Sequence, residues 1–311
     1  MENLESLKLF LNKKRKLSAF LIVLFIVLSS LFGAAGFPLL TVGVILVSDF
    51  TPQYVPLIMI IFGAISFFVL LPTFLFLIFK IQKDYRNLFS SKLSTLFLKD
   101  KYEGATYSYK GNETKVQKLF KDTPFKTNNK EPLGLIEGKI GATSFVSFSF
   151  PRTVPIDFKL FLGPAWNATM KRPKALYGLY AKFDFDFSFS HPLLIQKKGK
   201  ISSFKQIKLK TELTSESLYF NNEYRAYSDD ILEGTKRLTP PILSAIYHLN
   251  ELYHGFLNIY VNENHAYVCF DYYFTGFYFS TFKKVTHEYI DLFKNELLLP
   301  WHIFSLLNGF K

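Results

Sequence analysis

Two long uncharged runs dominate the first quarter of the chain. Residues 17–48 form a run of 32 residues without Asp, Glu, Lys or Arg, and residues 54–79 form another of 26. A helix needs about 20 apolar residues to cross the hydrocarbon core of a bilayer. The pattern therefore predicts a two-helix transmembrane hairpin over residues 17–79, joined by a short segment at 49–52.

The first run is longer than one span requires. Gly33, Gly36 and Pro38 lie in its middle, and such residues loosen or kink a helix. Residues 37–47 could therefore cross the membrane, lie on it or re-enter it. The alternative of a cleaved signal peptide is disfavoured, because the run exceeds the length of such a peptide's apolar core and a second uncharged run follows.

Basic residues flank the two runs on one side only. They are Lys13, Lys14, Arg15, Lys16, Lys80, Lys83 and Arg86, whereas the connecting segment has no Lys or Arg. Because such cations are retained preferentially on the cytoplasmic side, both termini are expected in the cytoplasm. Only six of the 37 basic residues are Arg, a bias typical of AT-rich bacterial genes. The sequence predicts a multi-pass protein whose partner is the lipid bilayer of the bacterial plasma membrane.

The remaining chain predicts an α+β fold. Residues 1–16 form a basic cytoplasmic N-terminus, 80–101 have the spacing of a juxtamembrane amphipathic helix, and 102–311 read as one cytoplasmic domain with a mainly antiparallel sheet and flanking helices. Strand-like alternation dominates the first half of this domain, and helical spacing returns near its end.

The clearest strand lies in the stretch KFDFDFSFSH. Phe183, Phe185, Phe187 and Phe189 alternate with Asp and Ser, which predicts a strand over 177–189 with one buried and one wet face. His191 is expected beyond the end of this strand, before a bend at Pro192.

The C-terminal third predicts helix, hairpin and helix. Thr239 is an expected N-cap before Pro240, and a helix should follow as far as Gly255. Residues 256–261 and 266–274 are expected to pair as a β-hairpin around Asn262–His265. A last helix is expected from Val285 until Pro300 interrupts it.

Composition adds a basic charge to this domain. Five Lys and Arg and three Asp and Glu precede residue 80, so residues 80–311 carry 32 cations against 22 anions, a net charge of +10. Such a charge suits an anionic leaflet or nucleic acid. If nucleic acid were the partner, its bases would stack on the aromatic stretch from Tyr267 to Phe279, beside Lys283 and Lys284. Nucleic acid ranks below anionic lipid as the expected partner. The single cysteine, Cys269, is expected to be a small, buried apolar residue.

Candidate chemistry is confined to a few acidic residues. Asp184 and Asp186 point to the same side of the expected strand about 6.6 Å apart, a spacing that a pair of catalytic carboxylates or a hard cation could use. If Asp184 and Asp186 bind a metal ion, His191 is the candidate for the third ligand. Asp229 is a further candidate for a catalytic residue. No phosphate-binding, dinucleotide-binding, serine-elbow or redox signature accompanies them, which favours a non-enzymatic role. No cofactor is assigned.

Residues 210–243 resemble a bacterial membrane-anchored family, domain of unknown function 3137. The matching residues are Phe220, Tyr224, Tyr227, Ser228, Asp229, Leu238, Thr239 and Pro240. The resemblance also takes in the expected hairpin and the two N-terminal spans, and it implies architecture without an activity. Many relatives have an acidic-alanine-arginine step where this chain has Glu233, Gly234, Lys236 and Arg237.

These observations favour an interaction role. The expected protein presents a basic cytoplasmic domain that binds another membrane or cytoplasmic protein, or anionic lipid, as a scaffold. The alternatives are a membrane-associated, metal-dependent enzyme and, third, membrane tethering of nucleic acid.

Overall fold

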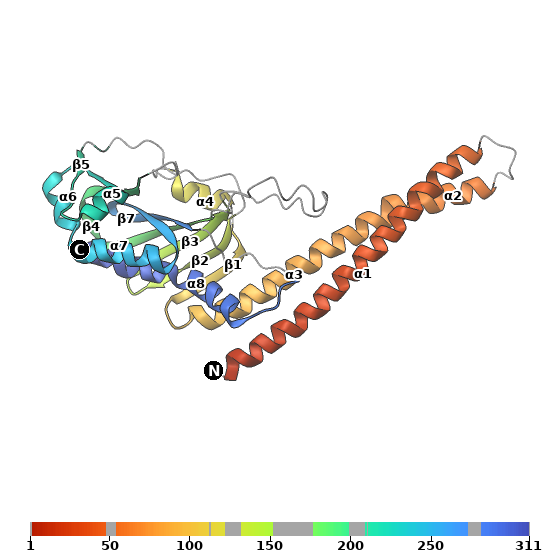
Figure 1. Cartoon of the computed structure of the whole chain (residues 1–311), viewed down its shortest axis with the longest axis horizontal. Helices are drawn as coiled ribbons and strands as arrows, with labels where there is room; N and C mark the ends of the chain where they lie inside the picture. The colour runs from red at the N-terminus through yellow and green to blue at the C-terminus, as the bar shows by residue number, and fades with distance from the viewer. Residues whose placement is uncertain are drawn as a thin grey trace. The chain divides into compact units, whose positions relative to one another are not determined.

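The computed structural model describes residues 2–47, 54–111, 113–121, 132–151, 177–198, 209, 211–272 and 281–310. The chain divides into two compact units, Met1–Ser90 with Phe279–His287 and Ser91–Tyr278 with Glu288–Lys311. The first unit contains the long apolar helices, and the second contains the sheet (Figure 1).

The first unit consists mainly of apolar helices. They are α1 (Glu2–Val47), α2 (Tyr54–Ala64), the π-helical η1 (Ile65–Leu70) and α3 (Leu71–Leu98). Two stretches, Leu4–Ile45 and Val55–Leu98, are long and apolar enough to cross a membrane. Pro38 lies inside α1, so residues 37–47 continue the same helix. Residues 49–52, expected to connect the two spans, lie outside the described residues.

Most apolar side chains of these helices lack protein cover. Only 11 % and 17 % of their most apolar windows are buried. Phe20, Phe62 and Phe76 are 64 %, 62 % and 66 % exposed. A core helix of a globular protein buries at least one apolar stripe, so this exposure fits helices surrounded by lipid.

Glycine sets the spacing between α1 and α2. A Cβ atom on Gly63 would lie 2.6 Å from the backbone nitrogen of Leu40 and 2.9 Å from the carbonyl oxygen of Gly36. Stacked rings of Phe25 and Phe74, 5.6 Å apart, extend the helix contact to α3. The two backbones approach as closely as small residues permit, a common device in membrane helix pairs.

The polar start of α1 contacts the segment that leads into the last helix. Asn12 donates a hydrogen bond to the carbonyl of Val285 (3.0 Å) and accepts one from its amide (3.1 Å). Arg15 donates to the carbonyl of Phe282 (3.1 Å). Arg15, one of the cations expected to orient the protein, therefore also fastens this segment within the first unit.

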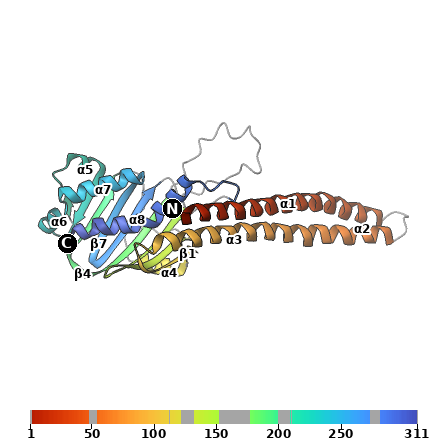
Figure 2. The ribbon, with the colours of Figure 1, turned by 90° about the horizontal axis from the view of Figure 1, so that it is seen from below.

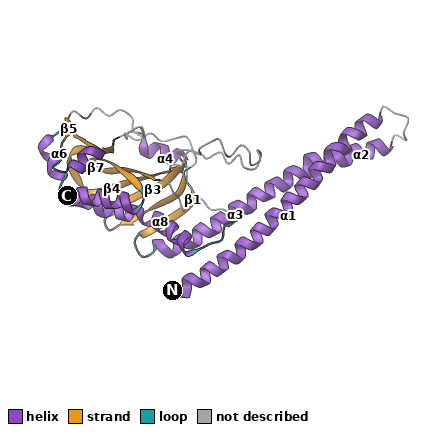
Figure 3. Ribbon diagram, in the orientation of Figure 1, coloured by secondary structure: helices purple, strands orange, loops and turns teal. Residues whose placement is uncertain are grey.

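A sheet forms the centre of the second unit. Its seven strands in the described part of the chain are β1 (Glu103–Lys110), β2 (Leu133–Ile140), β3 (Thr143–Pro151), β4 (Tyr177–Lys197), β5 (Thr211–Leu213), β6 (Tyr224–Ser228) and β7 (Gly255–Tyr272). The order is β1-β2-β3-β4-β6-β5, β7 pairs with β4, and every pairing is antiparallel. The predicted α+β class with a mainly antiparallel sheet is confirmed (Figure 3).

Strand β4 is longer than the sequence predicts. One edge pairs first with β3, from Tyr177 to Asp184, and then with β6, from Leu193 to Lys197. The strand therefore continues through His191 and Pro192, and the prediction that His191 lies beyond it is wrong. Proline is tolerated because register shifts interrupt the ladder with β7 between Asp184 and Leu193.

The predicted hairpin over 256–274 is also wrong. Its two halves form one strand, β7, and both pair with β4, from Ile259↔Ile195 to Tyr272↔Tyr177. Glu263 has φ 51° opposite the irregular part of β4. The polar residues that resemble a turn therefore lie within a continuous strand. The extra residues of the irregularity belong to β4, since Asp184 to Phe189 of β4 spans only His265 to Glu263 of β7.

Helices cover both faces of the sheet. They are α4 (Glu113–Phe120), α5 (Leu218–Glu223), α6 (Ile231–Arg237), α7 (Pro240–Leu252) and α8 (His287–Leu307), with a final 3-10 turn η4 (Asn308–Phe310). α7 and α8 lie over one face (Figure 2), where Phe183 and Phe185 contact Phe304 of α8 at ring distances of 6.4 and 6.1 Å. On the other face, Val116 of α4 packs in a cluster with Cys269. Phe183, Phe185 and Phe189 of the predicted row are buried and Phe187 is half-buried, and the predicted burial of Cys269 is confirmed.

Pro300 does not interrupt the last helix, contrary to expectation. α8 continues through it because Tyr102 fills the opening in its hydrogen-bond ladder. The Tyr102 hydroxyl donates to the carbonyl of Leu297 (2.7 Å) and accepts from the amide of Trp301 (3.2 Å), two groups that pair directly in a regular helix. Burial raises the pKa of Tyr102, which keeps the phenol protonated and able to donate.

Replacement of Tyr102 by Phe should destabilise the second unit. The substitution leaves a buried carbonyl and a buried amide without their shared partner, at a cost of about 1–3 kcal/mol. Thermal unfolding of the purified protein should show a lower midpoint. Tyr219→Phe is the control because Tyr219 is 55 % exposed, and equal midpoints for the two variants would contradict the bridging role.

Replacement of Gly63 by Ala should loosen the helix pair of the first unit. The new methyl would overlap the backbone of α1, and overpacking of this kind costs about 1–3 kcal/mol. Gly33→Ala is a matched control, since its Cβ would lie 3.9 Å from a Leu71 methyl, an ordinary contact. Unfolding midpoints in detergent should fall for Gly63→Ala only, and a fall for both variants would exclude the close approach as the cause.

Candidate functional site

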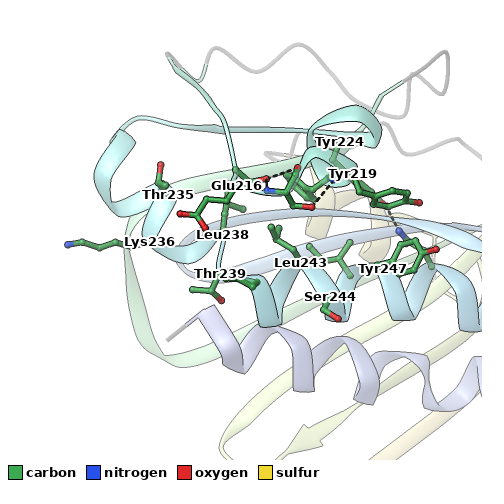
Figure 4. A pocket seen from close by; sticks show the side chains of 16 residues that line it. Glu216, Tyr219, Tyr224, Thr235, Lys236, Leu238, Thr239, Leu243, Ser244 and Tyr247 are labelled. Carbon is green, nitrogen blue, oxygen red and sulfur yellow. Dashed lines mark hydrogen bonds between the residues drawn. The ribbon is translucent and has the colours of Figure 1, made fainter.

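The principal candidate site is a groove formed by the helices that follow strand β5. It has a volume of about 750 Å³ and is lined by residues of α5, α6, α7 and the turns between them (Figure 4). The family-like residues that line it are Phe220, Tyr224, Leu238, Thr239 and Pro240. Its floor is largely apolar, with Leu243 and Ile246 of α7 buried beneath. The segment that resembles the family therefore builds a concave surface.

Side-chain caps hold the short helices of the groove in place. Ser217 caps α5, since its hydroxyl accepts from the amide of Phe220 (3.2 Å). Asn221 accepts from the amide of Ser215 (3.0 Å) and donates to its carbonyl (2.7 Å). Asp230 caps α6 by accepting from the amide of Glu233 (3.0 Å), and this bond lowers the pKa of the Asp230 carboxyl. Capping compensates for the low intrinsic stability of helices of six or seven residues.

A hydrogen-bonded pair joins the groove floor to the sheet. Asn250 of α7 donates to the hydroxyl of Tyr224 (2.6 Å) and accepts from the amide of Leu257 in β7 (3.0 Å). Burial raises the pKa of Tyr224, so this phenol stays neutral. The Tyr224 ring stacks on Phe220 at 5.2 Å. The floor is therefore positioned by both β6 and β7.

Exposed apolar side chains occur on the helices that line the groove, and we call them its apolar rim. Leu218 of α5 is 80 % and Leu232 of α6 is 74 % exposed. Tyr219 and Tyr247 meet edge to face at 4.8 Å. Ile231 and Leu252 are exposed as well. Exposed apolar groups clustered around a concavity mark a binding surface more specifically than isolated ones do.

The other family-like residues support the groove from the sheet. Ser228 is fully buried, and its hydroxyl donates to the carbonyl of Pro192 (2.8 Å) and accepts from the amide of Asp230 (3.3 Å). Tyr227 lies in β6, and its hydroxyl bonds with Arg225. Asp229 follows β6, and its charge acts with burial to raise the pKa of Tyr260. None of these three lines the groove.

Gly234 permits close packing of α6 on the sheet. A Cβ atom there would lie 2.6 Å from Leu213 Cδ1 and 2.8 Å from Ser228 Cβ. α6 therefore packs on β5 and β6 too closely for a side chain at position 234 unless Leu213 or Ser228 shifts.

The acidic candidates for catalysis or metal binding are dispersed. Asp184 accepts from Lys182 (2.8 Å) and contacts Nδ1 of His265 (2.5 Å), while Asp186 is exposed. His191 lies 3.7 Å from Asp230 and not beside Asp184. Among the described residues, no group of three or more His, Cys, Asp and Glu could hold a metal ion. The metal-dependent alternative stays a prediction.

Several groove residues were missed from the sequence. Tyr219, Tyr247, Glu216 and Asn250 carry no motif, and Tyr247 lies on the side of α7 away from its buried stripe. His265 was missed as the partner of Asp184 because the sequence predicted a hairpin within residues 256–274 and not the pairing of β7 with β4. An exposed tyrosine on an otherwise amphipathic helix was the available signal.

The groove lies within the residues that match a family model. No curated protein matches the chain. The crystal structure of the mycobacterial trehalose monomycolate transport factor A, TtfA, is similar over 67 % of this chain and 93 % of its own, at 7 % identity and a TM-score of 0.35. Residues 174–308 match the family model described as protein of unknown function (DUF3137), and the predicted resemblance is confirmed over these residues.

Proposed function

We propose that this chain is a bacterial membrane-anchored binding protein that recruits a partner protein through the groove between α5, α6 and α7. The observation that carries the proposal is the combination of a cavity of about 750 Å³ with exposed Leu218, Tyr219 and Leu232 at its rim. The volume falls in the range of about 300–1,000 Å³ typical of binding pockets.

The groove has the character of a surface for protein segments. Grooves between helices receive apolar anchor side chains of a partner helix or extended segment. Tyrosine is enriched at such interfaces because it combines a large apolar ring with a polar tip. Tyr219 of α5 and Tyr247 of α7 supply that combination together, since their rings are in contact at the groove.

Charge supports a cytoplasmic orientation. Lys13–Lys16 precede the first apolar stretch, and Lys80, Lys83 and Arg86 follow the second. The rule that Lys and Arg near span ends stay inside then places the sheet domain at the inner leaflet. Its net charge of +10 makes anionic lipid the second candidate ligand, by general attraction and not through the groove.

Reporter fusions test the orientation. Green fluorescent protein fused after residue 311 should fluoresce, and alkaline phosphatase inserted at 49–52 should be active, because the first reporter folds inside the cell and the second outside. A fluorescent C-terminal fusion together with inactive alkaline phosphatase at 49–52 would contradict two spans, and a dark C-terminal fusion would contradict the orientation.

Photocrosslinking in native membranes tests the binding role. Benzoylphenylalanine at position 219 or 247 should crosslink the same recurrent protein, identified by mass spectrometry. Benzoylphenylalanine at the exposed position 186, on the sheet, is the positional control and should give less of this adduct. Leu232→Glu, on the exposed rim, should reduce the adduct several-fold without unfolding the domain. The identified protein, purified and reconstituted, should bind the unmodified chain and bind Leu232→Glu more weakly.

Equal adducts from positions 219 and 186 would show that the groove has no special role. Adducts unchanged by Leu232→Glu would show that its apolar rim does not hold the partner.

A further inference from the structure

The groove differs in charge from the domain that carries it. Residues 80–311 have a net charge of +10, yet Lys236, which lines the groove, and Lys197, which lines the adjoining cavity, are already engaged in ion pairs. Lys236 is paired with Glu233 at 2.8 Å, and its ammonium extends away from the cavity (Figure 4). Lys197 forms an ion pair with Glu223 and lies over the ring of Phe256 at 4.6 Å. Neither cation is available to attract an anionic ligand into the groove.

The acidic groups at the groove are less engaged. Glu216 lines the cavity, is exposed, and has no ion pair within the described part of the chain. Glu251 lines an adjoining cavity of about 230 Å³, whose lining shares Tyr219, Tyr224 and Tyr247 with the groove. The groove is therefore locally acidic on a basic domain.

The aromatic rim adds a second attraction for cations. A ring face attracts Lys or Arg through its quadrupole, and an adjacent carboxylate strengthens the attraction. Tyr247 has both features, since it contacts Tyr219 at 4.8 Å and its hydroxyl bonds to Glu251. This hydrogen bond and the charge of Glu251 raise the pKa of Tyr247 to about 12, so the phenol remains neutral and adds no charge of its own.

We infer that the occupant of the groove is an apolar protein segment that carries Lys or Arg, of the kind found at the cytoplasmic end of a membrane helix. Its apolar side chains fill the floor over Leu243, and its cations pair with Glu216 in the groove or with Glu251 beside the two tyrosines. Segments of this composition are common in membrane proteins because Lys and Arg accumulate where apolar helices leave the bilayer on the cytoplasmic side. The inference rests on the proposed function and names the partner's chemistry.

Peptide selection tests the inference. Random peptides of about 12 residues, long enough to fill a helix-binding groove, are displayed on phage and selected against the full chain in phosphatidylcholine nanodiscs. Enriched peptides should combine apolar residues with Lys or Arg. The domain's overall charge favours acidic peptides, so enrichment of basic ones can come only from a local site.

Charge-neutral variants locate that site. The double variant Glu216→Gln, Glu251→Gln should raise the Kd of the best basic peptide, measured by fluorescence anisotropy, by about fivefold or more. A change of this size corresponds to the loss of an ion pair or cation–π contact. Asp186→Asn makes the same kind of charge change on the sheet and should leave the Kd unchanged. Glu216→Lys should weaken the binding of the basic peptide further.

Three results would overturn the inference: enrichment of acidic peptides, no enrichment at all, or equal effects of the groove and sheet variants. If basic peptides fail while groove photocrosslinks persist, the binding role stands and only the partner's chemistry is wrong. If the crosslinks also fail, the proposed function falls as well.

Discussion

The length of β4, one strand that pairs along both of its edges, is the constraint on which the sheet domain depends. β7 pairs with one edge of β4 from Tyr177 to Ile195, with register shifts between Asp184 and Leu193, while the other edge changes its partner from β3 to β6. A strand that changes partners must leave a gap on that edge. The gap falls at the irregular stretch before Leu193, where the Ser228 hydroxyl binds the carbonyl of Pro192. This bond and the β4–β6 pairing that begins at Leu193↔Ser228 together hold the end of β6, and therefore the start of α6, against the long strand.

The groove follows from the short connections that this arrangement imposes. α5 and β6 are contiguous at Glu223 and Tyr224, and only Leu238 and Thr239 separate α6 from α7. Helices of six or seven residues are too short to bury a full apolar stripe. α6 is further held against β5 and β6 by Gly234, which leaves Ile231 and Leu232 on its outer side. Exposed apolar residues around the cavity are thus a consequence of topology, and a bound segment would cover them.

Local patterns predicted the elements, whereas pairing between distant strands decided where the predictions failed. Uncharged length predicted the apolar helices, and alternation predicted the buried phenylalanine row. Thr239 before Pro240 placed the start of α7. Asn262–His265 resembles a turn because its residue types tolerate left-handed backbone, but Glu263 takes that conformation inside a continuous strand, opposite the irregular part of β4. Pro300 should break a helix, but Tyr102, nearly two hundred positions earlier, supplies the missing partners.

The same limit applied to the candidate site. The family-like residues could be recognised as a group, but the sequence did not show that five of them face a cavity while Tyr227, Ser228 and Asp229 do not. Asp184 and Asp186 looked like a pair because only their own strand was visible. The β4–β7 register instead places Asp184 opposite His265, and the two side chains are in contact. Side chains that meet across strands depend on register, and register is a property of the whole sheet.

Charge acts on this domain at two length scales, and under the proposal above the difference between them selects the ligand. The net charge of +10 produces a field that reaches about 8 Å at physiological ionic strength, enough to draw the domain toward anionic lipid or acidic protein. That field cannot choose between ligands with the same charge. Glu216, Glu251 and the paired tyrosines act only at contact, where screening is weak and ring and carboxylate geometry matter. A basic, apolar segment is repelled at a distance and attracted once it reaches the groove, so its binding depends on being delivered there. A segment held at the same membrane surface needs no long-range attraction, because confinement to that surface already supplies a high local concentration.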